Sequence, residues 1–270
     1  MIRSGETTGK LDEKLNYLSD QEEKDYDLNS KIKGAMTYPI FILGAMIVIG
    51  VLMMIFVIPK LTATLAQFGA QLPIMTRVLI AISDIMRNYW WLLAAVGFGG
   101  YIALRFYLKT PDGNRRFDML KFRIPIFGNI FQKIYLVRFS RSFSTLIASG
   151  IPVTRSLEIV ADVIGNVLYR DVTLETIREV EAGNSVASVM VRTKLIPPML
   201  PQRMIVGEQT GKLDLILDKL SAFYAKELEN VVANLVSIIE PLILVVMGVG
   251  VAFIVMAILL PMYNLSSAAG

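Results

Sequence analysis

Three long stretches without a charged residue set the main limit on how this chain can fold: residues 34–59, 88–104 and 241–270. A helix rises about 1.5 Å per residue, so the first run spans roughly 39 Å and the second roughly 26 Å, against a hydrocarbon core about 30 Å thick. Arg105 and Lys109 can lengthen the second span by snorkelling. The alternative is a set of buried helices in a large soluble core. The runs predict three transmembrane helices, at 35–59, 89–108 and 241–261.

Lysine and arginine are unevenly distributed around these spans. Residues 1–35 carry six of them, residues 105–240 carry eighteen, and residues 59–88 carry three. Basic residues accumulate on the cytoplasmic side of a membrane protein. We therefore expect the N-terminus and residues 109–240 in the cytoplasm, with two segments on the outside, 60–88 and the C-terminal tail 262–270.

The composition excludes most familiar catalytic centres. The chain is 54% hydrophobic, 19% charged and contains no cysteine and no histidine. This removes disulfides, thiol nucleophiles, Cys or His zinc sites and histidine bases. The net charge of +4 gives no reason to expect a nucleic-acid partner. We expect a protein that is not an enzyme and has no cofactor.

One eight-residue motif occurs twice, as GETTGKLD at residues 5–12 and GEQTGKLD at residues 207–214, 202 residues apart. It resembles a phosphate-binding loop, but each pair of glycines encloses three residues instead of four, and leucine replaces the hydroxyl residue after the lysine. A nucleotide site is therefore rejected. The shared positions that we single out are Gly5, Glu6, Gly9, Leu11, Asp12, Gly207, Glu208, Gly211, Leu213 and Asp214.

The same offset extends through the first and third spans without a gap. Pro39 matches Pro241 near the start of a span, and Pro59 matches Pro261 at its end. A direct repeat requires both copies to cross the membrane in the same direction, and the single span between them permits this. We interpret residues 1–34 as the C-terminal remnant of a first cytoplasmic domain, in a fragment or an internally started reading frame.

Residues 109–240 show helical periodicity and no credible strand pattern. Helices are expected at 129–149, 153–164 and 166–183, and a last helix that starts near Lys212 continues into the third span. An antiparallel bundle of about six helices fits the length and the loops. One face of the first helix is expected to enter the core, with Ile134, Val137, Phe139, Phe143, Leu146 and Ile147.

Some residues have two open interpretations. Gly207 and Gly211 allow tight backbone geometry. Glu208 would bond backbone amides at a neighbouring helix start, or would contact a metal or a partner. Asp214 suits the positive end of its own helix. Four charged residues form solvated or intrabundle pairs, or else a partner-binding face: Arg138, Arg141, Arg155 and Glu158.

Several segments, taken in order, resemble the type II secretion system F family, the polytopic inner-membrane platform protein of type II secretion and type IV pilus assembly. KIKGAMTYPIFILGAMIVIGVLMMIFVIP is similar to the family's first-span signature, with Tyr38 before Pro39 and a closing Pro59. The family's second cytoplasmic domain is matched in this chain by similar segments at 138–160 and 197–214 and by the pair Glu240–Pro241. The outer segment is similar through Gln71–Pro73 and Thr76.

The resemblance implies a bacterial inner-membrane platform with two homologous helical domains and three spans. Its implied partners are a hexameric assembly ATPase, pilin or pseudopilin subunits, other inner-membrane assembly proteins, lipid and further copies of itself. Gly44, Gly50, Gly248 and Gly250 would permit close packing of such copies. This chain departs from the family because most of the first helical domain is missing. Whether the ATPase docks fully onto this chain is therefore left open.

Two other function classes share some of these sequence features. Internal repeats with membrane spans suggest a secondary transporter, but transporters place ionisable groups or broken helices near the midplane, and these spans carry no charge. An intramembrane aspartyl peptidase needs two acidic residues at membrane depth. Asp84 is the only carboxylate expected outside the cytoplasm, so the peptidase is rejected and the transporter remains the alternative.

Overall fold

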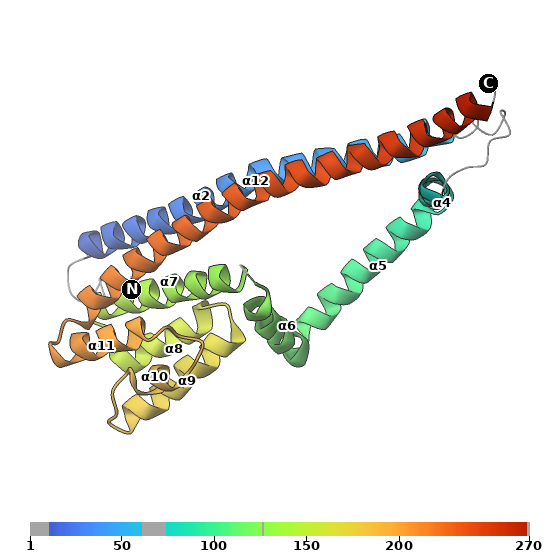
Figure 1. Cartoon of the computed structure of the whole chain (residues 1–270). Helices are drawn as coiled ribbons and strands as arrows, with labels where there is room; N and C mark the ends of the chain where they lie inside the picture. The colour runs from blue at the N-terminus through green and yellow to red at the C-terminus, as the bar shows by residue number, and fades with distance from the viewer. Residues whose placement is uncertain (1–10, 61–73, 126, 269–270) are drawn as a thin grey trace. The chain divides into compact units, whose positions relative to one another are not determined.

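The structure, a computed structural model, describes residues 11–60, 74–125 and 127–268, and its regular elements there are all helical (Figure 1). The all-α expectation is confirmed for these residues. η1 is a single π-helical turn. In chain order the elements are α2 (Leu11–Leu52), η1 (Met53–Val57), α4 (Ile74–Asn88), α5 (Trp90–Lys109), α6 (Pro111–Arg123), α7 (Phe127–Ala148), α8 (Val153–Val163), α9 (Val167–Glu181), α10 (Ser188–Arg192), α11 (Met199–Gln209) and α12 (Leu213–Ala268).

The chain divides into two compact units. The bundle unit combines the described residues up to Lys33 with Tyr107–Leu235. The spanning unit combines Gly34–Phe106 with the chain from Val236 onwards. Helices α2 and α12 each contribute residues to both units, because each continues past the boundary.

Helix α7 supplies much of the core of the bundle unit. Val137, Phe139, Phe143 and Leu146 are buried, as the helical pattern predicted, whereas Ile134 and Ile147 are only half-buried. Each fully buried side chain of this size contributes about 1.5–3 kcal/mol. The other helices add apolar side chains to the same cluster, among them Leu157, Val160, Tyr169, Leu200, Met204, Leu217 and Tyr224.

Polar caps fix where two helices of the bundle unit begin. The hydroxyl of Thr110 accepts the Gly113 N–H at 3.1 Å, and Pro111 occupies the first turn of α6. The side chain of Asn166 accepts the N–H groups at the start of α9. Such caps satisfy amides that have no partner within the helix.

The expected count of about six helices in the bundle remains a prediction, because it depends on whether the short helix α10 and the shared helices α2 and α12 are included.

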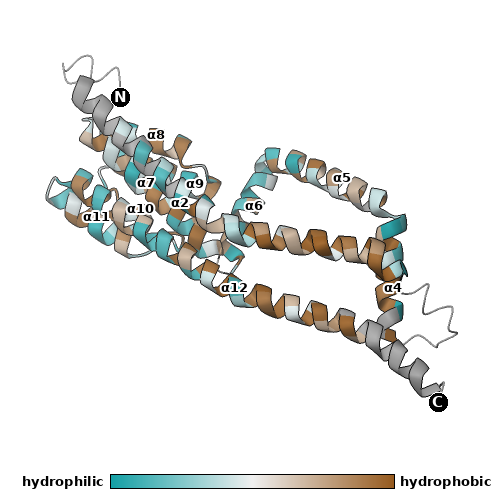
Figure 2. Ribbon diagram, turned by 90° about the horizontal axis from the view of Figure 1, so that it is seen from above, coloured by the Kyte–Doolittle hydropathy of each residue, from teal (hydrophilic) through white to brown (hydrophobic). Residues whose placement is uncertain are grey.

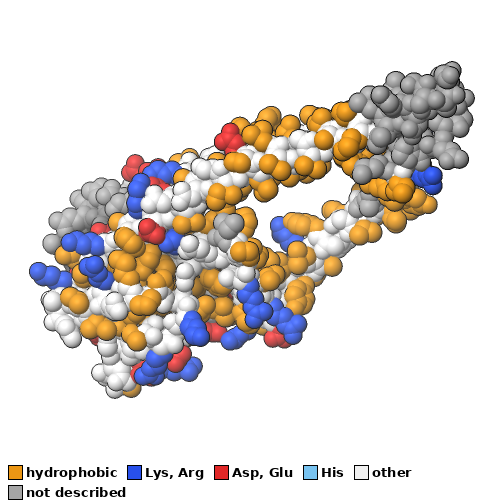
Figure 3. All heavy atoms as spheres, viewed as in Figure 1, with side chains coloured by type: hydrophobic (Ala, Val, Ile, Leu, Met, Phe, Trp, Pro, Cys, Tyr) orange, Lys and Arg blue, Asp and Glu red, His pale blue; other side chains and the backbone are white. Residues whose placement is uncertain are grey.

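Among the described residues, three helices are long and apolar enough to cross a membrane by length and composition, at Ser30–Lys60, Trp90–Lys109 and Leu213–Phe253. The prediction of three spans is confirmed at that level. Figure 2 colours the spanning-unit part of α12 mostly as hydrophobic, and Figure 3 shows exposed apolar side chains along the spanning helices. Pro39 lies inside α2 and Pro241 inside α12, so neither proline ends its helix.

Candidate functional site

The second copy of the repeated motif forms the turn between α11 and α12. Gly207 lies buried near the end of α11. A Cβ atom at this position would lie 3.1 Å from the Cα of Leu213 and 3.2 Å from the side chain of Ile216. The missing side chain therefore allows α11 to approach the first turn of α12 closely.

The turn itself has the hydrogen bonds of a Schellman motif. The Lys212 N–H donates to the Gly207 carbonyl at 2.9 Å, and the Gly211 N–H donates to the Glu208 carbonyl at 3.3 Å. Gly211 has a φ of +65°, in the left-handed region that favours glycine. These bonds satisfy carbonyls that the end of α11 would otherwise leave without partners.

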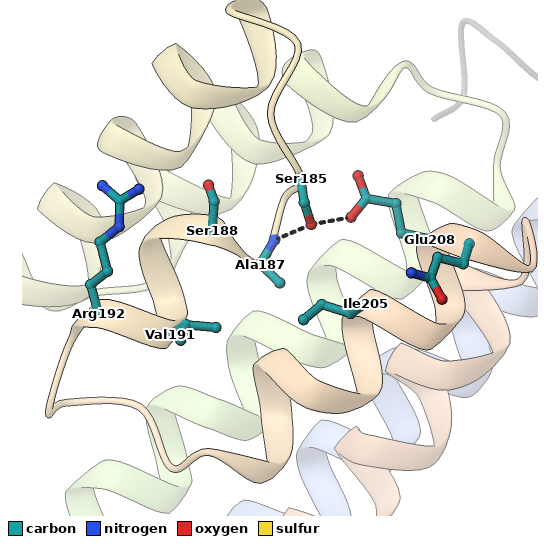
Figure 4. Close-up of a pocket in the computed structure, with 8 residues that line it drawn as sticks. Ser185, Ala187, Ser188, Val191, Arg192, Ile205 and Glu208 are labelled. Carbon is teal, nitrogen blue, oxygen red and sulfur yellow. Dashed lines mark hydrogen bonds between the residues drawn. The ribbon is translucent and has the colours of Figure 1, made fainter.

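The carboxylate of Glu208 holds the segment that leads into α10. It accepts hydrogen bonds from the hydroxyl of Ser185 and from the Val186 N–H at 3.3 Å. The Ser185 hydroxyl in turn accepts the Ala187 N–H at 3.2 Å, so three groups form a short chain (Figure 4). These amides precede Ser188, the first residue of α10, where N–H groups need partners outside the helix.

A pocket of about 460 Å³ lies beside this network, between α10 and α11 (Figure 4). Aliphatic side chains of Ala187, Val191 and Ile205 line it, with Arg192 and Glu208 as its charged groups. Glu208 is already engaged by the Ser185 loop, so the arrangement favours binding or support over acid–base chemistry. In the described part of the chain no three His, Cys, Asp or Glu residues could hold a metal.

A hydrogen bond and buried leucines secure the start of α12 beside α7. The Ser144 hydroxyl donates to the Asp214 carbonyl at 2.8 Å. Leu213 and Leu217 are buried in the core. Asp214 lies in the first turn of α12, where a negative charge is favourable to the helix dipole. The motif therefore connects α11 and α12 to α7 and, through Glu208, to the segment before α10.

The four charged residues expected to form solvated or intrabundle pairs, or else a partner-binding face, separate into two groups. Arg138 is exposed, and Arg155 and Glu158 form an exposed ion pair along α8. Arg141 is buried, and its Nε donates to the Ser221 hydroxyl of α12 at 3.3 Å. Of the two interpretations of Arg141, its geometry agrees with a contact within the bundle and not with a partner-binding face, because α12 covers its side of α7.

The first motif copy falls mostly outside the described residues, since Gly5, Glu6 and Gly9 precede Leu11. Leu11 and Asp12 belong to α2, and nothing is described of their side chains. The internal repeat therefore remains a prediction.

The span-bracketing residues lie within continuous helices. In α2, Tyr38 is exposed and Pro39 is buried. Pro59 is half-buried and follows η1. Glu240 and Pro241 are exposed in α12, which also contains Pro261. A bracketing role for these residues stays a proposal.

The sequence did not reveal that Asp118 organises the contact between α6 and α9. Its carboxylate is 2% exposed, accepts the Val167 N–H at 2.8 Å and pairs with Lys121 at 2.6 Å. Burial alone would lower the pKa of Lys121, but the hydrogen bond to Asp118 and the nearby Tyr135 outweigh it and raise that pKa. The i,i+3 spacing of Asp118 and Lys121 was the only local signal.

Ion pairs connect α12 to other helices of the bundle unit. Lys133 of α7 pairs with Glu227 at 2.9 Å, and Lys31 of α2 pairs with Glu229 at 2.8 Å. Neither pair was expected, because 94 and 198 residues separate the partners.

The model of the family described as "Type II secretion system (T2SS), protein F" matches residues 1–59 and 139–261. The match therefore includes the turn at Gly207 and the first and third spans.

Curated relatives agree with this match. The chain is 34% identical to "Type IV pilus assembly protein PilC" of Thermus thermophilus, with 98% of this chain and 66% of the relative covered. It is 30% identical to the protein of that name in Pseudomonas aeruginosa, with 100% and 72% covered. It is 33% identical to "Type II secretion system protein F" of Aeromonas hydrophila, with 99% and 69% covered. The chain thus spans about two thirds of the length of these relatives.

Proposed function

The chain belongs to the type II secretion system protein F family, and from that membership we propose that it is a non-catalytic inner-membrane platform of a type IV pilus or type II secretion machine. It couples a cytoplasmic assembly ATPase to the insertion or extraction of pilin-like subunits. The bundle unit receives the ATPase, and the spanning unit contacts the apolar helices of the subunits.

One observation carries this proposal: a packed helical bundle shares two of its helices, α2 and α12, with a unit built from apolar spans. Force applied to the bundle unit can reach the membrane through the backbone of these two helices. The motif at Gly207 supports the same role, because its contacts brace the start of α12 against α7 and α11, and Glu208 joins α11 to the segment before α10. A coupling protein needs such bracing more than it needs reactive groups.

We propose the following membrane arrangement. Residues 1–34 and 109–240 lie in the cytoplasm, and residues 60–88 and 262–270 lie on the other side. The distribution of lysine and arginine supports it. Single cysteines placed in the cysteine-free chain and labelled with a membrane-impermeant maleimide test it: labelling of intact cells at residue 84 and protection at residue 175 are expected.

The exposed residues Arg138, Arg155 and Glu158 mark the proposed ATPase-binding face. They lie on neighbouring helices α7 and α8 of the bundle unit. Charged rim residues at such an interface control the association rate and the choice of partner. Arg141 does not contribute to this face, because it is buried.

Binding of the host's assembly ATPase to the full chain in nanodiscs tests the proposal. The double substitution Arg138→Glu and Arg155→Glu is expected to weaken binding about tenfold, which corresponds to about 1.4 kcal/mol. The matched control is Arg203→Glu, a charge reversal at another exposed arginine, on α11. The control is expected to bind like the unchanged chain.

Two results would count against the proposal. A folded chain that binds no assembly ATPase, and that does not restore filament assembly in a host deleted for its own family member, contradicts the platform role. Equal weakening by the double variant and by Arg203→Glu contradicts the placement of the face while leaving the platform role intact.

A further inference from the structure

Helix α4 carries a row of large apolar side chains that the described residues leave uncovered. Ile74 is 78% exposed, Val78 47%, Ile82 41% and Ile85 50%. Successive residues of a helix turn by about 100°, so these four fall within an arc of roughly 80°. They form a single apolar face along the whole of α4.

The polar residues of α4 fall on a different side of the helix. Arg77, Asp84, Arg87 and Asn88 occupy an arc of about 100° next to the apolar face. All four are exposed. This separation of a charged face from an apolar one is typical of a helix that lies in a membrane surface.

The third side of α4 is attached to the spanning unit. Leu79 is 2% exposed and packs in a small cluster with Ile58, while Met54 and Phe253 contact the same cluster. Ser83 is 1% exposed, and its hydroxyl donates to the Met54 carbonyl. The apolar face and the polar face lie on either side of this attachment, each roughly 110–120° away from it around the helix.

The sequence explains why the Met54 carbonyl needs this donor. In the π-helical turn η1 the Ile58 N–H donates to the Met53 carbonyl, five residues back. The next donor in that series would be residue 59, but Pro59 has no N–H. A carbonyl without a partner is costly where water is scarce. Ser83 supplies the missing hydrogen bond and so fixes the rotation of α4 about its own axis.

The position of α4 in the chain places it at the membrane boundary. It ends at Asn88, and the second span begins two residues later at Trp90. Tyr89, Trp90 and Trp91 are exposed at this junction, and aromatic side chains of this kind settle at the level of the lipid headgroups. The end of α4 is therefore held at that depth by the chain itself.

We infer that α4 lies flat in the membrane surface from which the second span starts, with the row Ile74, Val78, Ile82 and Ile85 inserted among the lipid acyl chains. The occupant of this face is lipid. The inference depends on the three spans alone and stands apart from ATPase binding. Ser83 acts as a positioning residue that sets the depth and rotation of the helix.

Depth-dependent quenching tests this inference. Because the chain has no cysteine, Val78→Cys and Asp84→Cys each carry one environment-sensitive fluorophore in the full chain in nanodiscs. Lipids brominated high on the acyl chain are expected to quench the probe at residue 78 at least twofold more than the probe at residue 84. Adding Ser83→Ala is expected to reduce that difference.

The unmodified chain provides a second measurement that does not depend on cysteine variants. Lipids with a photoreactive group near the headgroup end of the acyl chain are expected to cross-link to Ile74, Val78, Ile82 or Ile85 and to leave Arg77 and Asp84 unmodified. Equal quenching at residues 78 and 84 overturns the inference. A probe at residue 78 that is shielded from both water and lipid also overturns it, because a second copy or another protein would then cover the face.

Discussion

The carboxylate of Asp118 accepts a hydrogen bond from the backbone N–H of Val167 at 2.8 Å, which joins α6 to the first residue of α9. The same carboxylate pairs with Lys121. Asp118→Ala leaves the half-buried Lys121 and the Val167 N–H at the start of α9 without this partner. We expect the free energy of unfolding to fall by about 2–3 kcal/mol.

Thermal unfolding of the detergent-solubilised chain measures this loss, with an expected decrease in Tm of about 5 °C or more. Asp162→Ala is the control, because Asp162 is 74% exposed and lies 3.7 Å from Arg170. A surface pair of this kind contributes about 0–1 kcal/mol. Equal effects of the two substitutions would show that burial of Asp118 gives it no special role.

Gly207 and Gly211 should both resist substitution, for different reasons. Gly207→Ala places a methyl group 3.1 Å from the Leu213 Cα and should cost about 1–2 kcal/mol by overpacking. Gly211→Ala should cost about 1 kcal/mol, because φ is +65° there, and Gly211→Asn should cost less. Chemical denaturation measures both. Gly248→Ala, in a helix and with open space around it, is expected to be neutral or slightly stabilising.

Removing the Glu208 carboxylate should loosen the segment before α10. Glu208→Ala eliminates the acceptor for both Ser185 and Val186, whereas Glu208→Gln keeps one oxygen. Amide hydrogen exchange at Val186 and Ala187 should accelerate about fivefold in Glu208→Ala, which corresponds to about 1 kcal/mol, and less in Glu208→Gln. Unchanged exchange in both variants would exclude a bracing role, and Glu175→Ala serves as the exposed control.

Tyr169 should cause the free energy of unfolding to decrease at alkaline pH. Burial raises the pKa of its phenol, and the neighbouring Tyr224 and Tyr135 raise it further. In the unfolded chain the Tyr169 phenol ionises near pH 10. The contribution of the buried phenol to stability is therefore complete below about pH 10 and is lost as the pH rises further. The free energy of unfolding should therefore fall above this pH more steeply for the unchanged chain than for Tyr169→Phe.

Tyr169→Phe should have only a small effect at neutral pH. It removes the hydrogen bond from the phenol to the Leu195 carbonyl at 2.9 Å, but Gln132 also donates to that carbonyl at 2.8 Å. We expect a cost of about 1 kcal/mol at pH 7. Parallel pH profiles for the two proteins would contradict the assignment of the alkaline loss to Tyr169.

The features that the sequence predicted well depend on local rules. A membrane requires an uninterrupted apolar helix of sufficient length, so the charge-free runs were enough to identify three spans. The buried positions of α7 were visible in part for a similar reason, since Phe139, Phe143 and Leu146 recur with helical spacing, whereas Val137 lies about half a turn away from Leu146.

The features that the sequence did not reveal depend on contacts between distant segments. Arg138 and Arg141 are three residues apart and look equivalent along α7, yet Ser221 of α12 covers only Arg141. The Asp118–Val167 contact joins residues 49 positions apart. No local pattern contains that information, because it arises when the helices pack.

The π-helical turn η1 has a consequence for the comparison of the two proposed repeat copies. A π-turn takes up about one residue more than an α-helical turn, and one residue corresponds to about 100° of helical phase. The first copy has this turn at Met53–Val57, whereas α12 remains α-helical at the matching positions 255–259. Residues of the two copies that align without a gap therefore point in different directions around their helices after Val57. Deleting one residue from Met53–Val57 is expected to restore an ordinary α-helical turn while Ile58 keeps its side toward Leu79.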